Sequence, residues 1–438
     1  MPSAQRVTAV TAAKVLRNPK IWVMPTTLVG LVALLLSLIY LGGILNPRGN
    51  LHRMPIGLVN ADRGAQVAGQ QVNLGAQITA QIAAAPDPQH QVSWRVLDQA
   101  GAQEKLTSGQ LYAVLEVAPD FSAAVTALGA PGQQPPPRPT MTVLTNPGAG
   151  SLASSLATSI SQAAAHAASA SLGTTLTQRQ QAQGGQPTNA EALVLADPIT
   201  VTVAVGHPIG SNSGLGLTAF YYSLLLVLMG FLGGNVINNS VDIALGYAAS
   251  EFGPWRRELP TVPISRTQTL VVTSSMSVVL SVLTSSMIML AGVVILDMDA
   301  SHLPLLWVYS VCATATVGLG TQALNAAFGG IGQLISMFIF IALSLPSSGA
   351  TIPLQALPTF YKVLSYFEPM RQLTDGVRAI LYFDARADAG LARAWSMMAV
   401  GLVAALVFGF AMTRYYDRKG LHRIVPEHQH PQDQPSGA

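Results

Sequence analysis

The sequence has little cysteine and little charge. Among its 438 residues there is one cysteine, Cys312, and 10% are Asp, Glu, Lys or Arg, whereas 50% are apolar. A single cysteine excludes an intramolecular disulfide, so any polar domain must be held together by packing. The small net charge of +3 argues against a nucleic-acid-binding protein. This composition predicts a polytopic membrane protein that carries a sizeable polar domain.

The sequence also lacks the motifs that enzymes and motor proteins use. It contains no G-x-x-x-x-G-K-[ST] loop for nucleotide phosphates and no G-x-S-x-G nucleophile elbow. No group of Cys and His residues has the spacing of a metal site, and we interpret the isolated His166 as a helix-surface residue. We therefore expect no catalytic residue, no metal and no cofactor, and the chain is not expected to be an enzyme.

An uncharged apolar segment of about 25 residues, 21–45, predicts the first membrane helix. At a rise of about 1.5 Å per residue it can cross a hydrocarbon core of ~30 Å. Basic residues without acidic ones precede it in the segment 1–20, which we expect to be amphipathic and cytoplasmic. A cleaved signal peptide is the alternative, although the run exceeds the usual ~7–15 apolar residues and no small-x-small site follows.

Between residues 46 and 213 the composition changes to Gln, Ala, Pro, Thr and Ser, and no run is long enough to span a membrane. A short apolar run predicts a strand at 54–60, alternation predicts one at 91–97, and β-branched residues predict one at 199–205. Two further strands are expected at 111–117 and 140–144. A helix over 65–84 between the first two strands favours an α/β sheet domain, which the first span would place outside the cytoplasm. The Ala- and Ser-rich segment 148–183 predicts one or two long helices, with a flexible linker as the alternative.

Five further apolar runs follow this domain and have the length of membrane spans. They cover 214–236, 267–296, 303–324, 329–345 and 394–413. With the amino terminus inside, basic residues gather in the segments that would face the cytoplasm, including a partly disordered tail, 414–438. The segment 346–390, with nearly balanced charges, would lie outside. We expect six spans in the cell (plasma) membrane, with the N and C termini cytoplasmic.

Three groups of short motifs connect the chain to a known family. They are the segments 16–20 and 55–65, the Tyr-Ala strand with its Pro-x-x-Phe-Ser element within 108–122, and Leu357-Pro358, Glu368-Pro369-Met370 and Asp375-Gly376-Val377-Arg378. In this order around six spans they resemble the membrane subunits of type-2 ABC exporters (ABC-2 permeases), and most closely the YhgE/Pip (phage infection protein) branch.

This resemblance implies a fold and a set of partners. The fold class would be an α-helical polytopic membrane protein, ABC-2 permease-like, with an α/β extracytoplasmic domain inserted between the first and second of six transmembrane helices. Glu368, Pro369, Asp375 and Arg378 would belong to outer re-entrant helices before the last span. The partners would be a second permease copy in a homodimer or heterodimer, a separate nucleotide-binding ATPase subunit and membrane lipids.

The loop between the second and third spans is the most informative polar segment. Apolar residues at helical spacing over 242–252 predict an amphipathic helix. By resemblance this would be the coupling helix that docks on the ATPase, with Asp242, Tyr247, Glu251, Phe252, Trp255, Arg256, Arg257 and Glu258 at the contact. The alternative is a helix on the inner leaflet, with Trp255 as anchor and the arginines on anionic lipid, and the segment 1–20 allows the same two interpretations.

Four amides lie within or beside the predicted spans: Asn235, Asn238, Asn239 and Asn325. Such groups either bond a neighbouring helix or contact a substrate. The span interiors contain no acidic residue, which argues against a proton-coupled pump.

Taken with the resemblance, these features predict an exporter permease. It would move an apolar or amphiphilic substrate, such as a lipid, a drug or an envelope component, out of the cytoplasm or inner leaflet, as in multidrug resistance. The alternative is a non-transporting membrane scaffold, or a secretion-accessory or receptor protein that acts through its extracytoplasmic domain.

Overall fold

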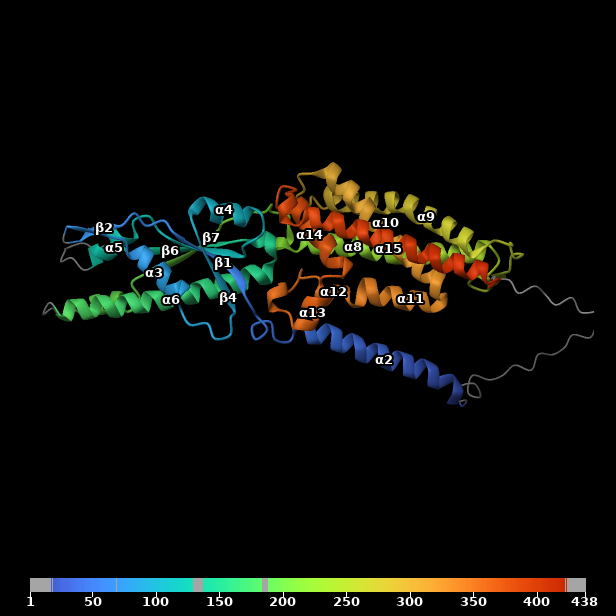
Figure 1. Ribbon diagram of the computed structural model, residues 1–438, viewed down its shortest axis with the longest axis horizontal. Helices are drawn as coiled ribbons and strands as arrows, with labels where there is room; N and C mark the ends of the chain where they lie inside the picture. The colour runs from blue at the N-terminus through green and yellow to red at the C-terminus, as the bar shows by residue number, and fades with distance from the viewer. Residues whose placement is uncertain are drawn as a thin grey trace, which may run out of the picture.

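The computed structural model describes residues 17, 19–67, 69–128, 137–182, 188–421 and 423. The molecule is elongated, with a sheet domain at one end and a bundle of long helices at the other (Figure 1). Most of the predicted head 1–20 and most of the tail 414–438 beyond residue 421 lie outside the described residues.

Six described helical segments are long and apolar enough to cross a membrane. They are α2 (Pro19–Ile44), α8 (Thr218–Ala244), α9 (Arg266–Met289) with its π-helical continuation Leu290–Ile295, α10 (Leu303–Phe328), the segment Gly330–Ser347 formed by α11 (Gly330–Met337), a π-helical turn (Phe338–Ala342) and α12 (Ser344–Ser347), and α15 (Leu391–Arg418). The six predicted spans are therefore confirmed by length and composition, and the chain is a polytopic membrane protein. The start of α2 and the end of α15 lie at the same end of the molecule, away from the sheet (Figure 1).

The bundle is built around α10, which contacts α8, α9, α11 and α15. Small residues allow this close packing: a Cβ added to Gly230 of α8 would lie 2.7 Å from the Cβ of Val317, and one added to Gly234 would lie 2.9 Å from Thr321 Cγ2. Helices in a membrane associate through such close backbone approach because lipid offers no hydrophobic driving force between them.

The sheet has five strands in the order β4-β1-β5-β6-β7. The strands are β1 (Met54–Asn60), β4 (Val92–Leu97), β5 (Ala113–Val117), β6 (Thr140–Thr145) and β7 (Thr200–Val205). Neighbours pair in parallel except β5 and β6, which are antiparallel. The five predicted strands are thus confirmed, and α4 (Gln99–Thr107) and α5 (Phe121–Leu128) connect them.

The segment 148–183 contains one continuous helix, α6 (Ser151–Ala182), so the linker alternative is wrong. Its small buried residues Ala157, Ala165 and Ala168 join the core formed by β1, β5 and β6. The far part of α6 extends along and beyond the sheet (Figure 1).

The helix predicted over 65–84 is wrong in its first part. A short antiparallel hairpin, β2 (Ala65–Val67) and β3 (Gln70–Val72), precedes α3 (Leu74–Ala83). Gly64 and Gly69 take φ of +77° and +80°, a left-handed backbone that a helix excludes and a glycine permits. Asn73 then caps α3 by accepting from the N–H of Ala76, so the helix begins late.

The amphipathic helix predicted over 242–252 is also wrong. The span α8 continues to Ala244, beyond the predicted end at 236, and an antiparallel hairpin follows, β8 (Ser250–Phe252) and β9 (Trp255–Arg257). Gly246 ends the helix with φ of +74°, and Gly253 with φ of +59° starts the tight turn of the hairpin. The apolar periodicity of this segment belongs to strands and turns instead.

The helix α14 (Pro369–Tyr382), which follows α13 (Thr359–Leu364), joins the sheet domain to the bundle. His207 at the exit of the sheet hydrogen-bonds the carbonyl of Tyr382 at 2.7 Å, and Phe383 stacks on the His207 ring. The hydroxyl of Tyr382 donates to Ser213 and accepts from the N–H of Ala219, at the entrance of α8. The segment 346–390 therefore fixes how the two parts sit together.

Candidate functional site

A polar cleft of about 200 Å³ lies between the end of α8, the start of α9 and the end of α10. Its polar side chains are Asn238, Asn239, Asp242, Arg266, Thr269, Thr273, Gln322, Asn325, Gln333 and Arg423. Asn239 and Gly330 are exposed at its surface, whereas Gln322 and Asn325 are buried, so the cleft leads from the surface to buried amides. Three of the four predicted asparagines line it.

The fourth predicted asparagine, Asn235, supports the cleft from behind. Its Nδ2 donates to the carbonyl of Phe231 at 3.0 Å, and its Oδ1 accepts from Asn325 Nδ2 at 3.0 Å. This amide pair ties α8 to α10, as expected for a packing role. The Oδ1 atom of Asn325 is buried and has no hydrogen-bond partner among the described residues.

Gln322, which the sequence reasoning missed, lies one turn before Asn325 on α10. Its Nε2 donates to the carbonyl of Gly234 at 2.8 Å and to Ser277 Oγ at 3.2 Å, so it connects α8, α9 and α10. Its Oε1 is buried without a partner in the described part of the chain. An amide three residues before another within an uncharged run was the available signal, because i and i+3 share a helix face.

Charged residues close the cleft at its surface. Arg423 contacts both carboxylate oxygens of Asp242, at 2.5 and 2.8 Å, and lies over the Tyr247 ring at 4.4 Å. Hydrogen bonding to Asp242 raises the pKa of Arg423 above its usual value. The carboxylate of Asp417 accepts from the backbone N–H groups of Arg266 and Thr267, each at 3.0 Å. The end of α15 therefore holds the ends of α8 and α9.

The residues predicted to couple to an ATPase fall into two places. Asp242 and Tyr247 belong to the wall of the cleft and its Arg423 contact, whereas the others lie on the β8–β9 hairpin. There Arg256 pairs with Glu258 at 2.7 Å and with Glu251 at 3.7 Å.

Two further backbone pairs join the strands of the hairpin, and the side chain of Trp255 is exposed to solvent. The backbone of Phe252 pairs with Trp255 and that of Arg257 with Ser250. Trp255 is 72% exposed. Such an exposed aromatic with flanking charges suits a docking surface or a membrane anchor.

The predicted outer motif lies at α14, near the sheet domain (Figure 1), and none of its four residues lines the cleft. Glu368 is buried and caps α14 by accepting from the N–H groups of Met370 and Arg371 at 2.7 and 2.9 Å, with Pro369 in the first turn. Burial raises the pKa of Glu368 to about 7.

The remaining two motif residues also bond locally. Asp375 lies 3.8 Å from Arg371, and the buried Arg378 donates to the carbonyls of Gly349 and Ala350. The Glu-Pro motif is therefore a helix cap, and Arg378 joins α14 to the segment 349–350.

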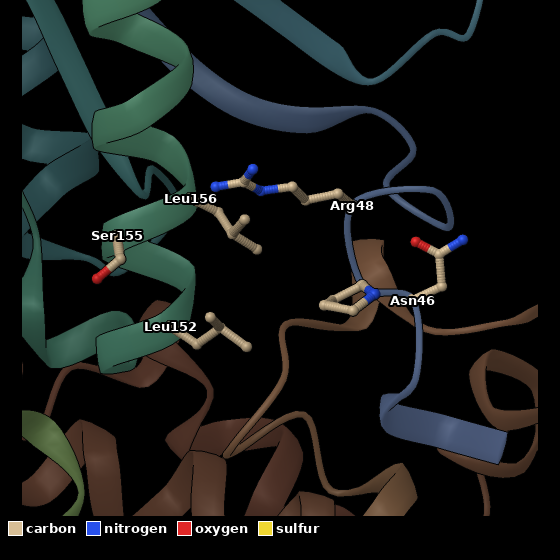
Figure 2. A pocket seen from close by; sticks show the side chains of 6 residues that line it. Asn46, Arg48, Leu152, Ser155 and Leu156 are labelled. Carbon is tan, nitrogen blue, oxygen red and sulfur yellow. The ribbon is translucent and has the colours of Figure 1, made fainter. Parts of the chain in front are cut away.

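A second hollow, of about 290 Å³, lies between the segment 46–48 and α6. In Figure 2, Leu152 and Leu156 point from α6 toward this segment, and Arg48 extends along the rim. The lining is mainly apolar and has no set of converging hydrogen-bond groups, so the polar cleft is the stronger candidate. Within the described ranges, no three His, Cys, Asp or Glu residues are grouped so that they could hold a metal ion.

Comparison with known proteins adds the family. No curated protein and no solved structure matches the chain. The model of a family described as "Protein of unknown function (DUF3533)" matches residues 26–401, from the first spanning helix into the last. Because this match covers most of the six-helix architecture, the chain belongs to the DUF3533 family.

Proposed function

We propose that this protein is the membrane permease subunit of an ABC-2 type exporter, similar to the YhgE/Pip branch, and that it moves an amphiphilic substrate such as a lipid or drug out of the cytoplasm or inner leaflet. The observation that carries the proposal is the cleft, where buried amides of α10 lie beside a polar opening between α8, α9 and α10. Buried polar groups within spans are costly and mark substrate paths in membrane proteins.

In this proposal the protein lies in the plasma membrane with both termini in the cytoplasm. Six spans return the chain to the side where it started, and the basic residues before α2 and after α15 favour the cytoplasm for that side. The sheet domain would then lie outside, and the cleft and the hairpin would open toward the inner leaflet.

The β8–β9 hairpin would take the place of the predicted coupling helix. It joins α8 to α9, and both helices line the cleft, so a partner that moves the hairpin would move two walls of the site. The exposed Trp255 supplies an apolar anchor, and Arg256 with its two glutamates supplies a polar rim. The motor would be a separate ATPase, and two permease copies would pair to complete the path.

Affinity purification in mild detergent, followed by an ATPase assay, tests this function. We expect an ATPase to co-purify with the wild type and to be lost with Trp255→Ser and with Arg256→Glu. Arg95→Glu, a charge reversal at an exposed position of β4, is the matched control and should retain the ATPase. If no ATPase accompanies the wild type and deletion leaves drug export unchanged, the exporter proposal fails.

The second candidate is a scaffold or receptor that acts through the sheet domain, and the length of α6 favours it. This helix of 32 residues extends past the sheet, where a partner could bind it (Figure 1). If the protein acts as a scaffold or receptor through α6, removing residues 174–182 should abolish binding of the partner. If it acts as a permease, the same deletion should leave export unchanged.

A further inference from the structure

We propose that the cleft binds a primary ammonium head group, as carried by phosphatidylethanolamine, and that Gln322 and Asn325 accept its N–H hydrogen bonds. The inference deepens the proposed function because it names the head group of the amphiphile. It rests on the proposed function only for the step of export. The binding itself depends on the cleft alone.

The orientation of the Gln322 amide follows from its neighbours. Main-chain carbonyls can only accept, so the contact of 2.8 Å with the carbonyl of Gly234 must be made by Nε2. The opposite assignment would place two oxygens against each other. Oε1 is therefore an acceptor. No described residue donates to it, and the residue is only 1% exposed.

The same reasoning orients Asn325 through one intermediate. Asn235 must present Nδ2 to the carbonyl of Phe231, which leaves its Oδ1 to face Asn325. Asn325 therefore donates through Nδ2. Its own Oδ1 is an acceptor without a partner among the described residues, and the residue is 5% exposed. The two buried acceptors lie on one face of α10 in residues that line the cleft, and no described residue donates to them, so a molecule bound in the cleft can supply the missing donors.

The charges around these acceptors suit a zwitterionic head group. Asp242 and Arg423 pair with each other at the wall, and the guanidinium of Arg266 lies at the same opening. An ammonium can donate to the amide oxygens while a phosphate lies toward the guanidinium groups. A trimethylammonium head group carries no N–H, so phosphatidylcholine cannot satisfy the amides. Phosphatidylethanolamine can.

Water is the competing source of donors, since a cleft of about 200 Å³ has room for several molecules at ~30 Å³ each. The two cases differ in selectivity. Ordered water would leave the protein indifferent to the head group of the surrounding lipid. Recognition by the amides makes it distinguish lipids that differ only in their N–H groups.

Native mass spectrometry of the delipidated full chain, with added phosphatidylethanolamine or phosphatidylcholine of identical acyl chains, tests the inference. We expect phosphatidylethanolamine to be retained at least tenfold better, and free ethanolamine at the same concentration not to displace it. Equal retention of the two lipids would mean ordered water only and would overturn the proposal. Displacement by free ethanolamine would overturn the assignment to a lipid.

Variants locate the effect. Gln322→Met and Asn325→Leu should each reduce the preference to near one. Ala326→Phe keeps both amides but fills the cleft, so it should lower retention of phosphatidylethanolamine even if the other two variants fold poorly. Thr316→Val, on α10 but outside the cleft, should keep the wild-type preference. The measurement requires neither ATPase nor export, so its failure and that of the proposed function are separate results.

Discussion

The guanidinium of Arg423 holds the carboxylate of Asp242 through two contacts of 2.5 and 2.8 Å, although 181 residues separate them in the sequence. The pair connects the chain beyond α15 to the end of α8, and it closes one side of the polar cleft. Both side chains are partly shielded from solvent, at 28% and 18% exposure, which makes the pair stronger than an open surface ion pair.

Removing this ion pair should loosen the cleft. We expect Arg423→Gln to lower the free energy of unfolding by roughly 1.5 kcal/mol, because two charge-assisted hydrogen bonds are lost. Unfolding in detergent, followed by tryptophan fluorescence, measures the change. Arg257→Gln, at an exposed position of β9, serves as the control and should leave the midpoint unchanged. An equal loss of stability in both variants would contradict a stabilising role for the Arg423–Asp242 ion pair.

Glu368 should make stability depend on pH. Burial raises its pKa from 4.5 to about 7, so between these values the folded protein keeps a proton that the unfolded chain has released. Stability from this group therefore increases as the pH falls from about 7 to 4.5, by roughly 3 kcal/mol, and is constant above and below this window.

Unfolding midpoints between pH 4.5 and 8 measure this dependence. Glu368→Gln carries no titrating carboxyl, so its stability should lack this rise, whereas Glu258→Gln on the exposed hairpin should retain it. A wild-type rise that persists unchanged in Glu368→Gln would assign the effect to another group.

Two neighbouring glycines of α8 should respond in opposite ways to alanine. The Cβ of Gly234→Ala would lie 2.9 Å from Thr321 Cγ2, whereas Gly233 has no other group within 4 Å of its Cβ position. We expect Gly234→Ala to destabilise the bundle by about 1–3 kcal/mol through overpacking. Gly233→Ala should be neutral or stabilising by up to ~1 kcal/mol because alanine favours the helix. Thermal unfolding of the two variants side by side measures this, and similar shifts would rule out the α8–α10 contact.

Tyr361 should anchor the end of α2. Its hydroxyl lies 2.9 Å from the carbonyl of Ile39 and 3.2 Å from that of Leu38, while most large apolar residues of α2 are exposed. Tyr361→Phe should therefore broaden the distribution of distances between spin labels at residues 29 and 407. Pulsed electron paramagnetic resonance in a Cys312→Ser background measures this distribution. Tyr366→Phe, an exposed neighbour, is the control. An unchanged distribution for Tyr361→Phe would mean that other contacts hold α2.

The positions of spans and strands were open to prediction because their signals are one-dimensional. A membrane requires about 20 consecutive apolar residues, so α9 and α10 could be recognised without any knowledge of their neighbours. Alternation likewise located β4, and β-branched residues located β7. Local reasoning was wrong over 242–252, where the same apolar spacing fits a helix or a hairpin, and the left-handed glycines Gly246 and Gly253 select the hairpin.

Only part of the candidate site could be predicted from the sequence. The sequence by itself determined that the chain has six segments long and apolar enough to cross a membrane and that amides such as Asn235 and Asn325 lie near the ends of these segments. Only the tertiary structure decided that these two bond each other, that Gln322 joins them, and that Arg423 reaches Asp242. The physical reason is that contact between helices depends on their rotation and depth, which are set by the packing of all of them together and not by the composition of any one.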